Sequence, residues 1–454
     1  MKAKSLPPGP GSHNMLNNLR ALRTNVPVYL QEIARRYGDI AYLRIGRQRI
    51  ILLNHPDFIR DVLVTHNRKF AKGRGMKFIK KVIGNGLLAS EGEFHLRQRR
   101  MMQPLFHKKR IAAFAGMMAD TAAGFQVAWR NREAVDMADE MMKLTLTIAG
   151  KALFSVDIRD ECEEIGQALD TAMRLFPRMM MPAGGLLFRL PLPETRAFNR
   201  AIARMETTIQ RMIAERRTQD NPPDDVLTLL LNARDEQGSD QMTGRQIRDE
   251  VITLLLAGHE TTAIALTWTW FLLATHPHVE ERLHAELAHV LDGRLPTAED
   301  LPALTCTYNI LRESMRLYPP AYVIARRALS EHEIGGYLIP ENATVLMSQY
   351  VMHRDARFFR EPDFFLPERW DEPEMQDLPR FAYFPFGGGP RVCIGEAFAL
   401  QESMLILATL AQRWRFRLAS DQPVDILPRV TLRPRYGMRM IPELRVNKGS
   451  ALLV

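Results

Sequence analysis

A single cysteine near the end of the chain lies in unusual backbone. Residues 384–400 read FPFGGGPRVCIGEAFAL, so Cys393 follows three consecutive glycines and a proline and precedes a helix-like run. A cysteine acts as nucleophile or metal ligand in its thiolate form, which backbone N–H groups and a helix N-terminus favour. Glycines also let the backbone approach a flat cofactor closely. The segment predicts a thiolate site, and the alternative is a glycine-rich turn around a buried cysteine.

A second stretch has residue types suited to proton transfer. In LLLAGHETTAIAL, Glu260 and Thr261 follow Ala257 by three and four residues, so a helix places all three on one face. The Thr261 hydroxyl can donate to the Ala257 carbonyl and open the helix locally. An acid and an alcohol can transfer protons, but a Glu-Thr-Thr run taken alone is weak evidence of function and is more often part of an ordinary helix. We interpret His259 as a packed or hydrogen-bonded helix residue.

The cysteine segment carries a family resemblance. The spacing of Phe386, Gly389, Arg391, Cys393 and Gly395 resembles the haem-binding signature of the cytochrome P450 family. The resemblance implies that Cys393 is the axial thiolate ligand of the iron in haem b. It also implies that Phe386 and Gly395 line the cofactor and that Arg391 pairs with a haem propionate.

The acid–alcohol stretch fits the same family. Ala257, Glu260 and Thr261 resemble the family's oxygen-activation motif, in which the acid and the alcohol relay protons and the small residue lets the cofactor pack closely. The resemblance therefore implies that Glu260 and Thr261 are catalytic and that Ala257 contacts the cofactor.

Further basic residues match cofactor-binding positions of the family. His95 and Arg99 are four residues apart on one expected helix and resemble its propionate-holding pair. Alignment through EIGGYLIP places Arg326 at another such position. Because haem carries two anionic propionates, several converging cations make physical sense.

An ExxR pattern resembles a structural feature of the family. Glu313 and Arg316 stand three residues apart, and LPERW supplies Arg369. In isolation such a pair is usually a surface ion pair worth a few tenths of a kcal/mol. The resemblance instead implies a buried structural triad of these three residues beneath the haem.

The expected substrate pocket is apolar. Its candidate lining residues are Met76, Phe78, Leu87, Leu256, Ala257 and Val323. Residues 175–190, rich in Met and Phe, are the expected lid over the entrance. The lining favours a lipophilic substrate such as a fatty acyl chain, a terpenoid or a steroid, with a slight preference for acyl chains because the motifs resemble fatty-acid-hydroxylating branches.

The fold expected from periodicity is mainly α with small β-sheets (α+β), as in the cytochrome P450 fold. A hairpin is expected around Gly46, short strands at 323–347, a long buried helix near 251–274 and a last helix from about 394 to 414. No composition break marks a second domain, so we expect one haem domain over residues 1–454, with an extended Pro/Gly-rich segment at 1–20.

Composition limits the cellular context. The chain has 454 residues, 46% of them hydrophobic, and three widely spaced cysteines, which argues against a disulfide framework and favours a cytoplasmic protein. Its net charge of +9 comes without a recognised nucleic-acid motif. A membrane anchor is not expected, because the apolar stretch at 251–274 contains His259 and Glu260.

The resemblance implies a monomeric monooxygenase that uses dioxygen. No flavin or iron–sulfur domain is recognised, so electrons are expected from a ferredoxin and an NAD(P)H-dependent ferredoxin reductase. Arg97, Arg100, Lys108, Lys109 and Arg110 form a candidate docking surface or a plain solvated face. Two alternatives stand beside this function: a peroxide-driven hydroxylase, and a haem-binding sensor or electron carrier without catalysis.

Overall fold

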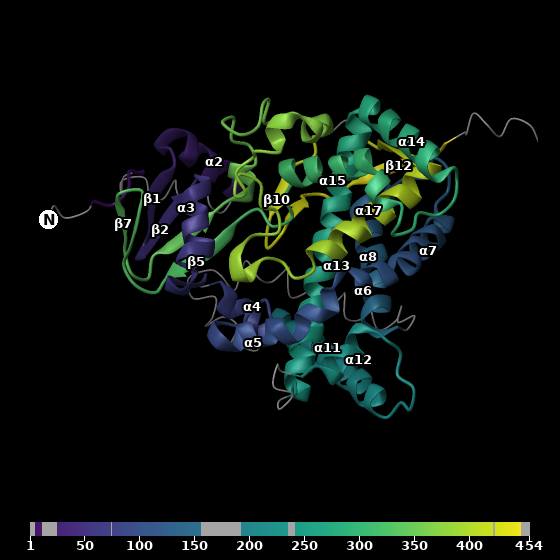
Figure 1. The fold of residues 1–454 in the computed structure, drawn as a ribbon, viewed down its shortest axis with the longest axis horizontal. Coiled ribbons are helices and arrows are strands. Elements are labelled where there is room, and N and C mark those ends of the chain that lie inside the picture. Colours follow the sequence, from purple (N-terminus) through teal and green to yellow (C-terminus); the bar gives the residue numbers. More distant parts are fainter. Residues whose placement is uncertain are drawn as a thin grey trace, which may run out of the picture.

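The computed structural model of the chain describes residues 5–10, 25–73, 75–155, 192–234, 241–420 and 423–445. The expected lid at 175–190 and the side chain of Phe78 lie outside this description. Figure 1 shows a small sheet at one end of the molecule and a larger helical part at the other, and one long helix runs through the helical part.

The largest sheet has the strand order β1-β2-β8-β5-β3. Its strands are β1 (Ile40–Ile45), β2 (Gln48–Leu53), β3 (Phe70–Lys72), β5 (Ile324–Ala328) and β8 (Thr344–Met347). The β1–β2 pair is the hairpin expected around Gly46, which has a φ of +55° at its tip. Pairing is antiparallel except between β2 and β8, and residues 5–10 lie along the outer edge, where Pro8 accepts from Tyr42.

Helices make up most of the remaining described chain. Before the long helix they are α2 (Val26–Tyr37), α3 (Pro56–Arg60), α4 (Met76–Ile83), α5 (Gly92–Met102), α6 (Lys108–Ala113), α7 (Ala115–Phe125), α8 (Met137–Phe154), α11 (Pro193–Arg217) and α12 (Val226–Asn232). From the long helix onward they are α13 (Gly244–Thr275), α14 (Pro277–Leu291), α15 (Thr305–Leu317), α16 (Gln349–Met352) and α17 (Glu396–Arg413). Short turns include the π-turn η2 (Asp61–Thr65) and the 3₁₀ turn η9 (Gly389–Arg391).

The long helix α13 is the central element of the fold (Figure 1). It begins with a capping box, in which the Thr243 side chain accepts from the Gln246 N–H and the Gln246 side chain accepts from the Thr243 N–H. Most of its side chains are buried, and it packs against α8, α15 and α17. It is apolar on nearly all sides because protein surrounds it, as expected for a core helix.

Within the part of the chain that the structure describes, two helical segments are long and apolar enough to cross a membrane, namely Lys108–Ala128 and Gly244–Thr275. Their most apolar windows are 39% and 78% buried inside the protein. Core helices of globular proteins pass the same test, so these segments do not show a transmembrane anchor.

Small β elements complete the chain. A three-stranded sheet joins β4 (Val135–Asp136), β12 (Arg439–Leu444) and β9 (Trp414–Leu418). Two further sheets are antiparallel hairpins of two strands each. One pairs β6 (His332–Ile334) with β7 (Tyr337–Ile339), and the other pairs β10 (Ile426–Pro428) with β11 (Leu432–Pro434). The short strands expected at 323–347 are therefore confirmed, and the last helix ends at Arg413, next to the expected limit.

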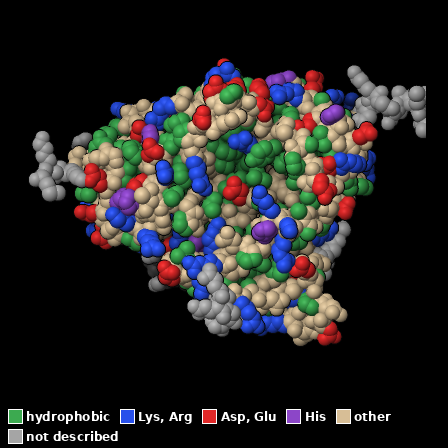
Figure 2. Space-filling model, in the orientation of Figure 1, with side chains coloured by type: hydrophobic (Ala, Val, Ile, Leu, Met, Phe, Trp, Pro, Cys, Tyr) green, Lys and Arg blue, Asp and Glu red, His purple; other side chains and the backbone are tan. Residues whose placement is uncertain are grey.

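Lys and Arg side chains are dispersed on the face shown in Figure 2, where they alternate with acidic and apolar side chains. Such mixing differs from the continuous basic stripe that a nucleic-acid backbone would require.

Candidate functional site

The loop that carries Cys393 is held by its own backbone and by a neighbouring turn. The Cys393 N–H donates to the Phe386 carbonyl at 3.0 Å, and the Gly387 N–H donates to Phe384 at 2.9 Å. Gly389 has a φ of +67°, and a Cβ there would lie 1.9 Å from the carbonyl oxygen of Leu63. The loop thus needs glycine at this position, both for its conformation and for its close approach to η2.

The Cys393 side chain is exposed, unlike most residues around it. Although the side chain can be reached by solvent, the protein atoms packed around it displace much of its water, and this desolvation raises the pKa of the Cys393 thiol; a hydrogen bond from the Gly395 backbone and the nearby Arg99 guanidinium act in the opposite direction. A metal ion at the sulfur would remove the proton outright. The loop therefore presents an accessible sulfur whose thiolate form is favoured by a bound metal.

The central helix α13 is accessible to solvent at some of the residues that the sequence analysis selected. Ala257 is exposed and Gly258 and Thr261 are partly exposed, although their neighbours on α13 are buried. The Thr261 hydroxyl donates to the Ala257 carbonyl at 2.7 Å. Small side chains on this accessible strip leave room for a flat group against the helix, and the hydroxyl lies at its edge.

Glu260 does not share this accessible strip as expected. It is buried, and its Oε1 accepts from the Thr431 hydroxyl at 2.6 Å and from Nε and Nη2 of Arg433 at 3.0 and 2.7 Å. At about 100° per residue, positions three and four after Ala257 diverge by that angle, so Glu260 faces the β10–β11 hairpin while Thr261 faces the opening. The expectation that all three residues share one face is therefore wrong for Glu260.

Cations gather between the sheet and the cysteine loop. Lys72 on β3 lies directly opposite Arg326 on β5, and Arg391 of the cysteine loop is close enough to both to lower their pKa values. Burial is the larger cause, and it brings the pKa of Lys72 to about 7 and that of Arg326 to about 10. The Lys72–Arg326 pair is therefore destabilising, because like charges directly opposite each other on paired strands repel.

Two carboxylates partly balance this cation cluster. Glu91 accepts from Nη2 of Arg391 at 2.5 Å and from the backbone N–H of Lys72 at 2.7 Å. Glu250 on α13 accepts from the Leu87 N–H at 2.8 Å, and burial raises the pKa of Glu250 to about 7. The arrangement keeps an excess of positive charge in a partly buried place, which suits an anionic ligand group.

The two expected basic residues of α5 lie beside this cluster but differ in role. Burial, with the charges of Arg391 and Lys72 adding to it, lowers the pKa of His95 to about 3, so His95 is a neutral hydrogen-bonding group. Arg99 donates from Nη1 to the Val392 carbonyl at 2.7 Å. In this structure Arg99 therefore braces the peptide next to Cys393.

Glu313, Arg316 and Arg369 are brought together in the core. Arg316 makes two hydrogen bonds of 2.9 Å to the Glu313 carboxylate, and Nε of Arg369 donates to the same carboxylate at 2.9 Å. All three side chains are essentially inaccessible to solvent. The remaining guanidinium N–H groups donate to backbone carbonyls between His353 and Phe364, so every charge has partners.

This buried triad is connected to the cysteine loop. Arg316 donates to the His353 carbonyl at 2.7 Å, and the His353 Nε2 accepts from the Phe384 N–H at 3.0 Å. Burial holds the pKa of His353 well below its usual value, which keeps this ring nitrogen available as an acceptor. A hydrogen-bonded path therefore runs from the triad to the first residue of the loop.

The expected pocket residues separate into two regions. Leu87, Leu256 and Met76 belong to one apolar cluster at α4, α11 and α13, whereas Val323 packs against clusters beside α2 and Tyr322. Leu87 and Leu256 are buried in that cluster. Among the expected residues with described side chains, Ala257 is the fully exposed one.

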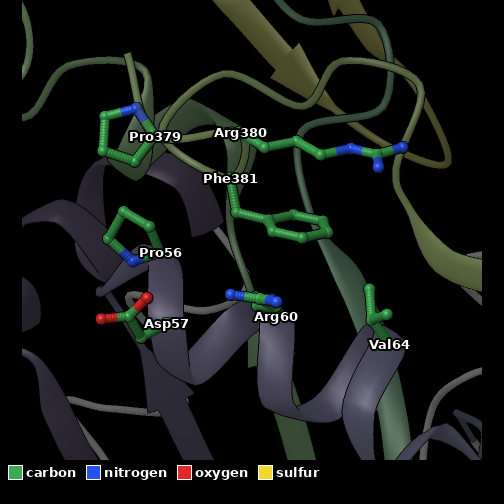
Figure 3. A pocket seen from close by; sticks show the side chains of 7 residues that line it. All are labelled: Pro56, Asp57, Arg60, Val64, Pro379, Arg380 and Phe381. Atoms are coloured by element: carbon green, nitrogen blue, oxygen red, sulfur yellow. The ribbon is translucent and has the colours of Figure 1, made fainter. Parts of the chain in front are cut away.

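A separate surface groove of about 360 Å³ lies between α3 with η2 and the chain that precedes the cysteine loop (Figure 3). Its lining residues are Pro56, Asp57, Arg60, Val64, Pro379, Arg380 and Phe381. The ring of Phe381 also packs where a Cβ on Gly388 would lie. The groove thus borders the cysteine loop from outside and does not contain the Cys393 sulfur.

Several residues of the site could not be found from the sequence. Lys72, Glu91 and Glu250 contribute to the charge cluster, and Thr431 and Arg433 hold Glu260. None of them falls in a recognisable motif. Lys72 is recognised only in the structure, where the pairing of β3 with β5 places it opposite Arg326.

The comparisons with known proteins agree with this geometry. The family described as Cytochrome P450 matches residues 7–440. The chain belongs to the cytochrome P450 family. Its mainly helical architecture is the P450 fold, since the crystal structure of the cytochrome P450DA heme domain superimposes with a TM-score of 0.89 at 28% identity, covering 98% of this chain and 99% of that one.

Two relatives of this P450 illustrate its similarity to bacterial enzymes. It is 40% identical to cyclooctatin synthase of Streptomyces melanosporofaciens, over 90% of this chain and 89% of the relative. It is 34% identical to pentalenene oxygenase of Streptomyces avermitilis, over 91% and 92% of the two chains. The protein is a cytochrome P450 monooxygenase whose cofactor is thiolate-ligated haem b.

The residues of this P450 fit such a cofactor. An accessible sulfur on the cysteine loop, an accessible strip of small residues on α13 and a cluster of excess cations supply a ligand, a packing surface and counter-charges. Haem needs each of these, because its iron takes an axial ligand, its ring is flat and apolar, and its propionates are anionic.

Proposed function

We propose that this P450 inserts one oxygen atom from dioxygen into a terpenoid-type lipophilic substrate, using electrons from a separate redox partner. The observation that carries the proposal is the accessible Cys393 sulfur combined with the open strip at Ala257 and Thr261 on the otherwise buried α13. Bound haem supplies the oxygen-activating redox chemistry.

The proposed roles follow from the contacts. Cys393 would supply the thiolate ligand of the haem, and the Arg99 hydrogen bond and the Gly389–Leu63 packing would fix its loop. Arg326, Arg391 and the newly found Lys72 would hold the propionates, while neutral His95 would donate a hydrogen bond. Phe386 and Gly395 position the cysteine through backbone contacts.

Proton delivery is proposed for the helix. Thr261 holds a hydroxyl at the edge of the accessible strip, hydrogen-bonded to Ala257. Glu260 would act as the acid behind it, from its place beside Thr431 and Arg433. Such a pair supports dioxygen-dependent turnover over the peroxide-driven alternative, which has no need of proton relay.

The carbon monoxide complex of the reduced protein tests the ligand. We expect the red-shifted Soret band typical of thiolate ligation, its loss in Cys393→His and its retention in Cys306→Ser, which changes another described free cysteine. Persistence of the band in Cys393→His would remove Cys393 from the ligand role.

A spectral titration tests the substrate class. Terpenoids, fatty acids and steroids of matched size are added to the ferric protein, and the low-to-high-spin shift is recorded. The relatives' names, pentalenene oxygenase and cyclooctatin synthase, support terpenoids over the acyl chains that the motifs slightly favoured. Tighter binding of fatty acids than of any terpenoid would overturn this choice.

The electron donor is proposed to be a ferredoxin with an NAD(P)H-dependent ferredoxin reductase, and the protein to be cytoplasmic and monomeric. Arg97, Arg100, Lys108 and Lys109 are exposed on α5 and α6, the helix pair that contacts the cysteine loop through Arg99. Arg97, Arg100 and Lys109 changed together to Glu should slow ferredoxin-supported turnover without affecting substrate binding. Unchanged turnover would place docking elsewhere, and equal turnover with peroxide alone would favour the peroxide-driven alternative.

A further inference from the structure

Three metal-ligating side chains converge away from the cysteine site. The Nδ1 of His66 lies 2.5 Å from one carboxylate oxygen of Asp61, and the Nε2 of His332 lies 2.6 Å from the other. One ligand atom from each residue can be chosen so that all three lie within 4.8 Å of one another. Neither His nor Asp here takes part in the proposed oxygen chemistry.

A π-turn creates the first half of this cluster. Asp61 and His66 are five residues apart, which in an α-helix corresponds to about 140° around the axis and would separate their side chains. In η2 the His66 N–H instead donates to the Asp61 carbonyl at 2.8 Å, closing a wider i→i+5 turn that stacks the two residues. Such turns are rare in proteins overall, and those that do occur are frequently found at functional sites.

The second half comes from a segment far along the chain. His332 opens β6 and is brought against η2 with its ring centroid 4.6 Å from that of His66, while Phe70 packs edge-on to it at 5.4 Å. The His332 side chain is 6% exposed, that of Asp61 23% and that of His66 39%. The cluster is therefore closed on the His332 side and open to solvent at His66.

One cation faces the cluster and orients it. The Lys69 Nζ lies 3.4 Å from Nδ1 of His332. The ammonium donates to this ring nitrogen, so the other nitrogen, Nε2, carries the ring proton and directs it at Asp61. The Lys69 ammonium would repel a divalent metal ion bound at this cluster, and the negative charge of the Asp61 carboxylate would offset that repulsion.

We propose that Asp61, His66 and His332 bind a divalent transition-metal ion, with Zn²⁺ the best match. Two imidazole nitrogens and one carboxylate oxygen are a common zinc ligand set, and a water molecule entering beside His66 completes four-fold coordination. On binding, each neutral imidazole keeps one proton, which moves from the nitrogen facing Asp61 to the other ring nitrogen, and on His332 this displaces the Lys69 ammonium from Nδ1. The ion would clamp η2, which packs on the cysteine loop at Gly389, to the β6–β7 hairpin.

Zinc binding to the haem-loaded full-length protein tests the proposal. The protein is treated with a chelator, titrated with ZnCl₂ by calorimetry, dialysed and analysed for zinc separately from iron. We expect one tightly bound equivalent, and an affinity lower by about 10–100-fold or more in His66→Ala and in His332→Ala. The matched control is His278→Ala, since His278 is also surface-exposed and pairs with a neighbouring histidine ring, 6.1 Å away.

Fold integrity and stability provide a second readout. His66 is partly exposed, so His66→Gln should keep the Soret spectrum and the thermal midpoint of the zinc-free protein. Added Zn²⁺ should raise the midpoint of the wild type and of His278→Ala, but not that of His66→Gln or Asp61→Asn. Zinc content and stabilisation that persist in these variants, or a wild type that retains no zinc, would show that the cluster is a hydrogen-bonded clasp only.

Discussion

The carboxylate of Glu260 and the guanidinium of Arg433 are joined by two hydrogen bonds, from Nε at 3.0 Å and from Nη2 at 2.7 Å. The contact ties the middle of α13 to strand β11. It also holds the proposed acid away from the accessible strip that carries Thr261. Proton delivery by Glu260 therefore requires its carboxylate to leave Arg433 or to act through water.

Replacing Arg433 tests this connection. Arg433→Gln should lower the free energy of unfolding by about 1–3 kcal/mol, because it leaves a buried carboxylate with a poorer partner. The matched control is Arg435→Gln, because the Arg435 guanidinium lies 3.8 Å from the Asp425 carboxylate in a more exposed place. Urea unfolding followed by far-UV circular dichroism compares the two, and equal losses would mean that the Glu260 contact adds nothing.

Thr261 is the residue whose hydroxyl is best placed for proton transfer. Thr261→Ala should reduce product formed per NAD(P)H by about 10²-fold, the lower end for loss of a proton-transfer group, and divert electrons to hydrogen peroxide. Thr261→Ser should restore much of the coupling. The control is Thr262→Ala, because the Thr262 hydroxyl is buried and donates to the Gly258 carbonyl. If Thr262→Ala uncouples turnover equally, the accessible hydroxyl has no special role.

The buried triad should dominate stability. Glu313→Gln leaves two buried guanidinium groups without their carboxylate and should cost about 3–5 kcal/mol of unfolding free energy, with weaker haem retention. The exposed pair Arg211–Glu215 provides the control, since Glu215→Gln should cost less than about 1 kcal/mol. Denaturant midpoints and the Soret absorbance measure both effects. A triad variant as stable as the control would refute the structural role.

Glu402 predicts a pH effect on stability. Burial between α17 and α13 raises the pKa of Glu402 to about 8, with Thr262 acting in the opposite sense. The folded protein therefore holds a proton that the unfolded chain loses, so stability falls as pH rises from about 4.5 to 8, with a limiting slope of about 1.4 kcal/mol per pH unit. Glu402→Gln should remove this loss.

The wild type and Glu402→Gln should therefore unfold at similar urea concentrations at pH 5. Their midpoints should diverge towards pH 8, where the variant is the more stable protein. Glu215→Gln is a useful control because the Glu215 side chain is exposed on a helix. Parallel curves for wild type and Glu402→Gln across this range would show that Glu402 is not protonated in the folded state.

Local patterns were enough to predict the parts of the fold that depend on local chemistry. The turn at Gly46 and the last helix after the cysteine loop lie close to where periodicity and turn residues placed them. The long helix was also recognised, but it begins at Gly244, seven residues earlier than expected, because a capping box rather than apolar periodicity sets its start.

Contacts between residues far apart in the chain could not be predicted from the sequence. Nothing in the local sequence of Thr431 and Arg433 indicates that they meet Glu260, since the hairpin that carries them follows the helix by more than a hundred and fifty residues. The face of Glu260 was consequently assigned wrongly. The meeting of Asp61 with His66 depends on a π-turn, and five-residue spacing gives no sign of it under α-helical periodicity.

The hydrogen-bonded path from Arg316 through His353 to Phe384 bears on how the holoprotein is assembled. Its links are made entirely by protein groups, as are the contacts of Arg99 with Val392 and of Gly389 with Leu63. The polypeptide can thus shape the cysteine loop before the cofactor arrives, and little ordering entropy remains to be lost on loading. Haem would then bind late, to a site that is already folded, and the rate of its incorporation would be limited by entry of the haem and not by folding of the loop.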